Sequence, residues 1–155
     1  MIARSLLVTL ALGLSLTAVE GQAYQVGDTI DDTIANQLQI SQGVALVNFF
    51  ASWCVSCKKE QPLIQSISAD LPQQGMRLVG VDTDENLQEG LAFQKKLGLS
   101  YPIVNDENQK IVAQFNPLGM PAFYFIQDRK VVKIHLGAVD HVDAMIANEL
   151  KGMMK

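Results

Sequence analysis

The feature that most constrains this chain is an apolar segment, 44–51, that leads directly into a pair of cysteines, Cys54 and Cys57. A run this continuously apolar is typical of a strand with both faces covered, as in a parallel sheet between helix layers. Residues 55–70 follow, with apolar side chains at helical spacing. The sequence therefore predicts a buried strand that runs into a helix, with two thiols at the joint.

The remainder of the chain alternates further apolar segments with helical patterns. Strands are predicted at 76–81, 101–104, 121–126 and 131–136. Helices are predicted at 33–40, 86–97, 108–115 and from Asp140 onward. Asn86 opens a capping-box pattern, Gly98 is a suitable helix stop, and Asp140 would cap the last helix. Together these units predict an α/β fold in which a central sheet of mixed direction is flanked by helices.

The inward faces of three predicted helices follow from the spacing of their residues. These faces are Ile34, Gln37 and Leu38 in the first, Leu87, Leu91, Phe93 and Leu97 in the second, and Val142, Met145, Ile146 and Leu150 in the last. We expect each set to pack against the sheet.

The length and charge of the chain limit the class of protein. A chain of 155 residues is the size of one domain and can bury a core without disulfide staples. The formal net charge of −4 and the lack of a basic cluster argue against nucleic acid as a partner. No cofactor is expected from the sequence.

The N-terminal residues have the pattern of a secretory signal peptide. Arg4 precedes an uncharged, leucine-rich segment, 5–19, and small residues follow at the −3 and −1 positions of a cleavage site, Gly21 and Ala23. A retained membrane anchor is the alternative, although 15 apolar residues are fewer than the roughly 20 that span a bilayer. We predict a periplasmic or otherwise exported protein, anchored through residues 5–19 if the signal is not cleaved.

The predicted organisation has three parts. Residues 1–23 form the signal peptide, residues 24–43 form a short lead-in, and residues 44–152 form the main domain. Only the main domain carries cysteines. Any thiol chemistry is therefore expected there.

The spacing of the two cysteines suits disulfide exchange. Cys54 would lie at a helix N-terminus, where unpaired amides and the helix dipole stabilise a thiolate. Cys57 follows one helical turn later, so Cys54 can attack a partner's disulfide and Cys57 can release the mixed disulfide. We expect Cys54 to be exposed at the joint and Cys57 to be more buried.

Other interpretations of the cysteine pair remain open. A structural zinc site needs four ligands, and His135 and His141 are not spaced as partner ligands. An inert disulfide across so short a loop would gain little from restricting the unfolded chain. A non-enzymatic module that binds Cu(I) through the two thiols is a third interpretation.

Two motifs resemble those of the thioredoxin superfamily, and in particular its exported TlpA- and ResA-like thiol–disulfide oxidoreductases. Residues 46–57 are similar to the active-site signature, and Pro62 matches the proline of the active-site helix. Residues 118–126 resemble the second motif, a strand entered through a cis-proline. The resemblance covers about residues 44–150 and implies a thioredoxin-like fold with one extra helix and strand at 86–104.

The resemblance implies roles for individual residues. Cys54 would be the catalytic nucleophile and Cys57 the resolving thiol. Pro121 would be cis and face the sulfurs, and Met120 would present its backbone to a substrate chain. Trp53 would flank the nucleophile and contact substrate. From the residues alone, Pro121 could equally be an ordinary strand-entry proline, and the Met120 and Trp53 side chains could serve packing.

The resemblance also bears on proton transfer. Asn48 stands where thioredoxin has a buried acid, and an amide cannot relay a proton, so any relay must come from elsewhere. Glu85 matches the position of an acidic residue near the thiols in ResA-like proteins and is the candidate relay. Its alternative is a solvated glutamate that precedes a helix.

The residues around the motif suggest the direction of electron flow. Val55 and Ser56 lack the histidine that makes many oxidases of this superfamily oxidising, which favours a reducing or intermediate potential. Ala122 stands where members that assist cytochrome c maturation carry an acid, which weakens that assignment. We predict a thiol–disulfide oxidoreductase that reduces disulfides in exported proteins and receives electrons from an upstream thiol donor, which could be membrane-bound. The alternatives are a disulfide oxidase or isomerase, and the copper-binding module.

Overall fold

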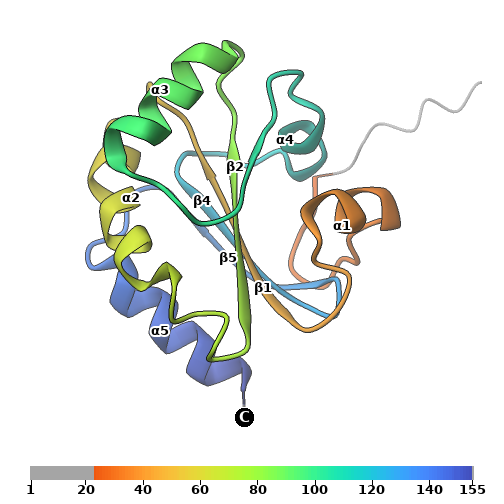
Figure 1. The fold of residues 1–155 in the computed structure, drawn as a ribbon. Coiled ribbons are helices and arrows are strands. Elements are labelled where there is room, and N and C mark those ends of the chain that lie inside the picture. The colour runs from red at the N-terminus through yellow and green to blue at the C-terminus, as the bar shows by residue number, and fades with distance from the viewer. Residues whose placement is uncertain (1–22, 155) are drawn as a thin grey trace, which may run out of the picture.

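The computed structural model describes residues 23–154, which form a five-stranded sheet flanked by helices (Figure 1). The strands are β1 (Val44–Phe50), β2 (Met76–Asp82), β3 (Ile103–Asn105), β4 (Ala122–Gln127) and β5 (Lys130–Leu136). Their order across the sheet is β3-β2-β1-β4-β5. β1, β2 and β3 are parallel, whereas β4 is antiparallel to β1 and β5 is antiparallel to β4. The predicted mixed sheet is confirmed.

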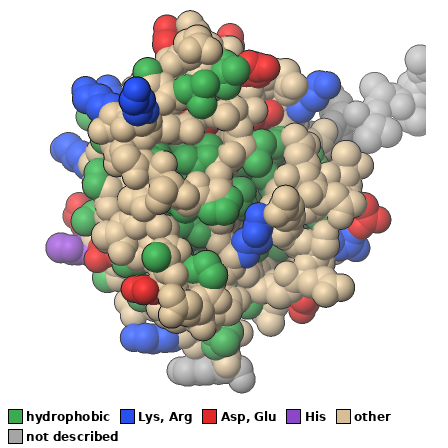
Figure 2. Space-filling view, viewed as in Figure 1, with side chains coloured by type: hydrophobic (Ala, Val, Ile, Leu, Met, Phe, Trp, Pro, Cys, Tyr) green, Lys and Arg blue, Asp and Glu red, His purple; other side chains and the backbone are tan. Residues whose placement is uncertain are grey.

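Helices cover both faces of this sheet. They are α1 (Asp32–Leu38), α2 (Val55–Ser68), α3 (Leu87–Leu97), α4 (Lys110–Phe115) and α5 (Val142–Met153). α2, α3 and α5 lie on one face, and α1 and α4 lie on the other (Figure 1). In the same view, Figure 2 shows hydrophobic side chains gathered between these two layers and most charged side chains around the periphery.

β1 is the centre of the core because all of its residues are buried. Its side chains alternate between the two faces of the sheet. Ala45, Val47 and Phe49 pack with residues of α1 and α4, whereas Val44 and Leu46 pack with residues of α2 and α5. Burial on both faces explains the continuous apolar run, and the predicted buried strand is confirmed.

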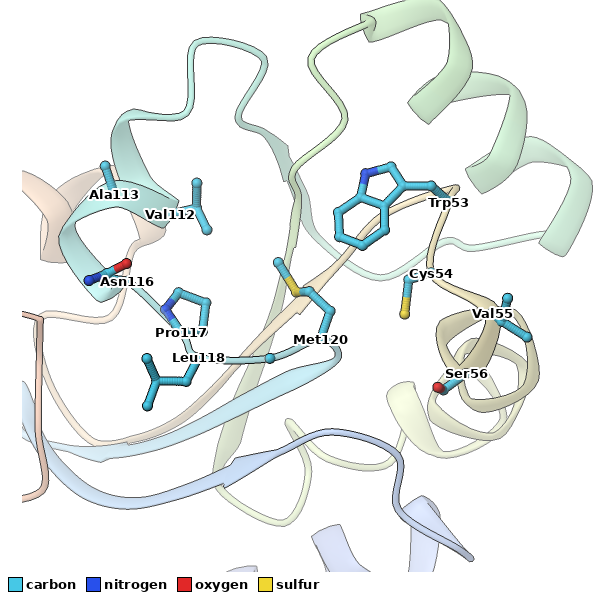
Figure 3. Close-up of a pocket in the computed structure, with 11 residues that line it drawn as sticks. Trp53, Cys54, Val55, Ser56, Val112, Ala113, Asn116, Pro117, Leu118 and Met120 are labelled. Carbon is cyan, nitrogen blue, oxygen red and sulfur yellow. The ribbon is translucent and has the colours of Figure 1, made fainter.

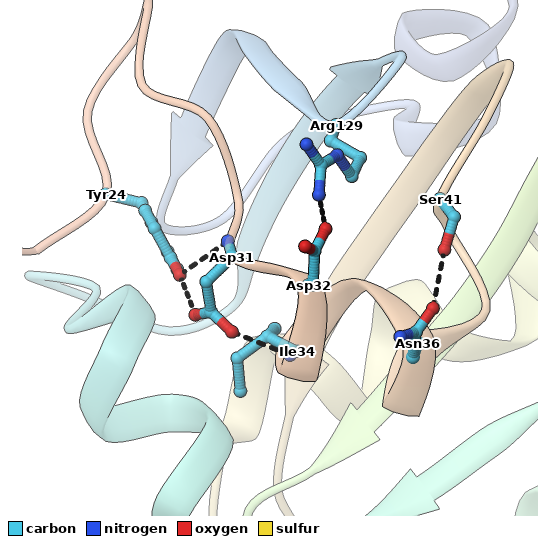
Figure 4. A network of polar contacts seen from close by, with 7 residues as sticks. All are labelled: Tyr24, Asp31, Asp32, Ile34, Asn36, Ser41 and Arg129. Atoms are coloured by element: carbon cyan, nitrogen blue, oxygen red, sulfur yellow. Dashed lines mark hydrogen bonds and ion pairs between the residues drawn. The ribbon is translucent and has the colours of Figure 1, made fainter.

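The segment before β1 is attached to the free edge of β5 through backbone and side-chain contacts. The Ile30 N–H donates to the Arg129 carbonyl at 2.8 Å. Figure 4 shows the accompanying contacts, among them the Tyr24 hydroxyl on the Asp31 carboxylate and the ion pair between Arg129 and Asp32. The backbone contacts pair the lead-in with Lys130 and Val131, so they cover the beginning of a strand edge that would otherwise be open to pairing with another chain.

Two predicted helix faces are wrong in detail. In α1 the inward residue beside Ile34 is Ala35, while Gln37 is exposed, because a helix this short presents only one narrow stripe to the core. In α3 the side chain of Leu91 is 40% exposed, and Gly90 is buried instead. Only a residue without a side chain fits where Gly90 stands, since an added Cβ would lie 2.7 Å from a carboxylate oxygen of Asp82.

The predicted cap of the last helix is also wrong. α5 begins at Val142, and its N-cap residue is His141, which has a left-handed backbone and makes no side-chain capping bond. Asp140 lies one residue too early to occupy the cap position. By contrast, Gly98 ends α3 in a left-handed conformation, as predicted.

No helix among residues 23–154 is both long enough and apolar enough to cross a membrane. The predicted signal segment falls almost entirely on residues 1–22, which lie outside the described part of the chain.

Candidate active site

The two cysteines lie where β1 ends and α2 begins, as the sequence predicts. Their sulfurs are joined in a disulfide. Cys54 is the N-cap residue of α2, and its sulfur accepts the Cys57 N–H at 3.2 Å. The first turn of α2 therefore directs unpaired amides and the positive end of the helix dipole at Cys54, an arrangement that stabilises a thiolate.

The burial of the pair differs from the prediction. Cys57 is fully buried, as expected for a resolving thiol, but Cys54 is only 5% exposed rather than open at the joint. Phe50 and Phe93 form a buried cluster with both cysteines, and Met120 packs against it. A partner can therefore reach Cys54 only from the side that these residues leave uncovered.

That side is a pocket of about 630 Å³ in front of Cys54 (Figure 3). Trp53 and Met120 line it together with Cys54, and their side chains point into the same space. The remaining lining residues carry no charge and are Val55, Ser56, Val112, Ala113, Asn116, Pro117, Leu118 and Gly119. The pocket is consequently an uncharged opening in front of Cys54.

The structure brings most of the predicted site residues together. The Met120–Pro121 peptide bond is cis, as the resemblance implies. Pro121 is buried directly behind Met120, and its carbonyl accepts the Gly137 N–H at 2.8 Å. Glu85 is the exception, because it is exposed in the loop between β2 and α3 and does not line the pocket.

A chain of uncharged polar groups lies beneath the site. Asn48 is fully buried and accepts a hydrogen bond from Gln61 Nε2 at 2.7 Å. The Gln61 Oε1 atom in turn accepts the Tyr101 hydroxyl, and burial raises the pKa of that phenol. The amide of Asn48 donates to the Ala122 carbonyl at 3.4 Å, next to Pro121. Sequence reasoning missed Gln61, although its place four residues after Cys57 on the inward face of a helix is a usable signal.

Glu60 is a second residue that sequence reasoning missed. It lies three residues after Cys57, is 5% exposed, and accepts the Val139 N–H on Oε1 at 2.7 Å. Its Oε2 atom has no hydrogen-bond partner among the described residues. Burial raises the pKa of this carboxyl above its ordinary value, because the charged form is poorly solvated there.

Buried carboxyls also lie at the end of β2. Asp82 is 1% exposed, and burial raises its pKa to about 6. Its Oδ1 atom accepts the Asp84 N–H at 3.0 Å, and its Oδ2 atom accepts Gln94 Nε2 at 2.7 Å. Sequence analysis did not single out either acid.

We expect the raised pKa of Asp82 to make folding stability fall as the pH rises. The protonated form is favoured in the folded state, so the contribution of this group is fully present below about pH 4 and is lost as the pH rises through about 6. Between pH 4.5 and 7.5, the unfolding free energy of wild type should fall by about 2 kcal/mol more than that of Asp82→Asn. Urea titrations at several pH values measure this slope.

Glu107→Gln is the matched control for that experiment, because Glu107 is an exposed acid beyond the end of the neighbouring strand β3. The comparison concerns the slope rather than the absolute stability, since an Asn carbonyl can replace only one of the two accepting oxygens. Parallel slopes for wild type and Asp82→Asn would contradict the prediction.

Comparisons with known proteins agree with this geometry. A model of the AhpC/TSA family matches residues 20–135. The thiol-disulfide oxidoreductase ResA of Bacillus subtilis (strain 168) is 29% identical over 115 residues, which cover 71% of this chain and 64% of the relative. The chain thus spans just under two thirds of the length of that curated relative.

Solved structures show the same fold. A putative thiol:disulfide interchange protein DsbE from Chlorobium tepidum superposes with a TM-score of 0.74 at 18% identity, covering 86% of this chain and all of that one. A secreted Mycobacterium tuberculosis disulfide oxidoreductase, homologous to E. coli DsbE, superposes with a TM-score of 0.62 at 23% identity, covering 72% of this chain and 84% of that one. At these identities the likeness shows the thioredoxin-like fold alone.

Proposed function

Because this chain belongs to the AhpC/TSA family of thioredoxin-like proteins, we propose that it is a thiol–disulfide oxidoreductase whose reacting groups are Cys54 and Cys57. The observation that carries the proposal is the Cys54–Cys57 disulfide at the N-terminus of α2, opening on an uncharged pocket. The name of the Bacillus subtilis relative, a thiol-disulfide oxidoreductase, supports the same activity.

In the proposed reaction the reduced protein first attacks a partner's disulfide. The Cys54 thiolate forms a mixed disulfide with one partner sulfur, and the second partner sulfur leaves as a thiolate that takes up a proton. Cys57 then loses its proton, attacks the Cys54 sulfur and releases the first partner sulfur as a thiol. The partner has gained two electrons and two protons, and the protein is left with the Cys54–Cys57 disulfide.

Docking of the partner is assigned to the pocket in front of Cys54. Trp53 and Met120 line it beside the reacting sulfur, and Pro121 follows Met120 through the cis peptide bond. Among the described residues the backbone N–H and carbonyl of Met120 take part in no hydrogen bond, so both are available to an extended chain. We propose that a substrate segment pairs with the Met120 backbone and places its cysteine against Cys54.

Proton transfer to and from Cys57 needs a group close to a buried sulfur. Glu60 is the better placed of two candidates, because it is buried on the same helix and its Oε2 atom has no partner among the described residues. Glu85 remains a predicted relay, and its exposure outside the pocket requires a water-mediated path.

The proposed direction is reduction of disulfides in exported proteins, with a dithiol donor that restores the reduced state. The dipeptide Val55-Ser56 contains no histidine to stabilise the thiolate further, which favours a reducing potential. Export is supported by the signal-like N-terminus.

The reduction potential of the Cys54–Cys57 pair tests this direction. We expect equilibration with glutathione buffers to give a value of about −270 mV, as for thioredoxin, because Val55 and Ser56 supply no histidine to stabilise the thiolate. A value of about −120 mV is that of a strong oxidant. Such a value would overturn the reductase direction and favour the oxidase alternative.

A further inference from the structure

Two buried carboxylates lie at the edge of the sheet that carries the disulfide. Phe50, the last residue of β1, pairs with Asp82, the last residue of β2. Asp84 follows two residues later, and the two acids are 1% and 5% exposed. The carboxyl ends of parallel strands meet at one edge of a sheet, so the loop after β2 lies against the turn that leads to Cys54.

Asp84 is bound to that turn through both of its carboxylate oxygens. Oδ2 accepts the Ser52 N–H at 2.8 Å, and Oδ1 accepts the Ser52 hydroxyl at 2.8 Å. Ser52 precedes Trp53 and Cys54 directly in the chain. The carboxylate therefore fixes the backbone that carries the proposed nucleophile.

Asp82 holds Asp84 from behind. The Asp84 N–H donates to Asp82 Oδ1 at 3.0 Å, and Gln94 of α3 donates to Asp82 Oδ2 at 2.7 Å. α3 approaches this closely because Gly90 has no side chain there. The contacts form a continuous chain from α3 through two carboxyls to the active-site turn.

The charge of this pair is not neutralised within the described chain. Neither acid forms a salt bridge among residues 23–154. A third buried acid at the same edge, Asp106, has a different task, because it accepts the first N–H groups of α4, from Ile111 at 3.0 Å and Val112 at 2.7 Å. Asp82 and Asp84 are thus the acids that bear on the turn.

We propose that Asp84, supported by Asp82, is a positioning residue that also lowers the reduction potential of the active-site disulfide. This inference rests on the proposed function. Two electrostatic effects on the Cys54 thiolate oppose each other. The N-terminus of α2 stabilises the thiolate, and the carboxylates of Asp82 and Asp84 destabilise it.

The direction follows from the charges in the two redox states. Reduction breaks the S–S bond and transfers two electrons from a donor dithiol, which leaves as a disulfide. One donor proton goes to the Cys57 sulfur, and the other is released to solvent because Cys54 remains a thiolate. The negative charge that appears on Cys54 is repelled by the carboxylates, whereas the oxidised pair carries no charge, so the reduced form is the one destabilised.

Asp84→Asn tests the proposal, because the amide oxygen can still accept one hydrogen bond from Ser52 while the charge is lost. We expect the equilibrium constant with glutathione to shift about tenfold toward the reduced form, which is about 30 mV for a two-electron couple. The pH midpoint of Cys54 alkylation should fall in parallel. Ser52→Ala removes one hydrogen bond and no charge, so it should change the alkylation rate more than the potential.

Glu107→Gln is the matched control, because it removes an exposed acid from the same edge of the sheet. If Asp84→Asn shifts the potential no more than this control, the proposal is overturned. If Asp84→Asn does not fold, Asp82→Asn replaces it, and a shift in the same direction supports the proposal while an unchanged potential rejects it. A wild-type potential of about −120 mV contradicts the reductase direction. The difference in potential between wild type and Asp84→Asn still decides the role of Asp84.

Discussion

Replacement of Cys54 with serine will abolish disulfide exchange, with a loss of at least about 10⁴-fold in turnover. The serine hydroxyl has nearly the size of the thiol but is a far weaker nucleophile at neutral pH, and it cannot form the mixed disulfide. Reduction of a disulfide-bonded peptide, followed by release of its thiols, measures the loss. Residual turnover within tenfold of wild type would contradict the assignment of Cys54 as nucleophile.

The matched variant Cys57→Ala will behave differently. Cys54 remains at the N-terminus of α2 and can still attack, but the buried thiol that resolves the intermediate is absent. We therefore expect a stable mixed disulfide between Cys54 and its substrate, visible on a non-reducing gel and lost on addition of a reductant. Isolation of this adduct from the compartment where the protein acts would also identify its partner. If Cys57→Ala forms no adduct while Cys54→Ala does, the two roles are reversed.

Replacement of Phe49 with alanine will have a large effect on stability, a loss of about 3–5 kcal/mol in the free energy of unfolding. Phe49 is fully buried in the central strand. Its ring packs against Phe115 of α4 at a centroid distance of 4.8 Å and against Tyr124 of β4 at 5.6 Å. Alanine would leave a cavity where a strand and a helix meet, and urea denaturation measures the cost.

Leu118→Ala is the control for that measurement, because the leucine is 92% exposed and is expected to contribute within about 0.5 kcal/mol. Equal losses for Phe49→Ala and Leu118→Ala would mean that the core is able to close around the missing ring. Both variants should be measured in the oxidised state, so that the Cys54–Cys57 disulfide is present in each.

Local patterns predicted the elements of the fold better than their faces. The apolar runs located the four long strands, because alternation and burial produce a pattern over four to eight consecutive residues. The short strand β3, Ile103–Asn105, was located less closely, at 101–104. The errors arose where a partner element decides which residue turns inward. Gln37 is exposed because the short helix α1 buries only Ile34, Ala35 and Leu38, and Leu91 is exposed because α3 turns Gly90 toward Asp82 instead.

The candidate site likewise has some features that the sequence predicts and others that only packing decides. The motif around Cys54 and Cys57 is contiguous, so its position at a strand–helix joint follows from the sequence. The cis bond before Pro121 follows from the resemblance of a second motif and is present in the structure. The near burial of Cys54 does not follow from either, because Phe93 and Met120, which cover it, come from distant parts of the chain.

The sequence by itself determined that a buried strand leads two thiols to the first turn of a helix, since both features depend on one contiguous segment, residues 44–57. Only the tertiary structure decided what surrounds them. Asp84 reaches Ser52 across 32 residues, and Tyr101 reaches Gln61 across 40. The contact of Asp84 depends on the register of β1 with β2, which places Phe50 beside Asp82, and no local pattern encodes that register. The position of the two thiols can therefore be predicted from the sequence, whereas the charges and hydrogen bonds that set their reactivity arise from tertiary packing.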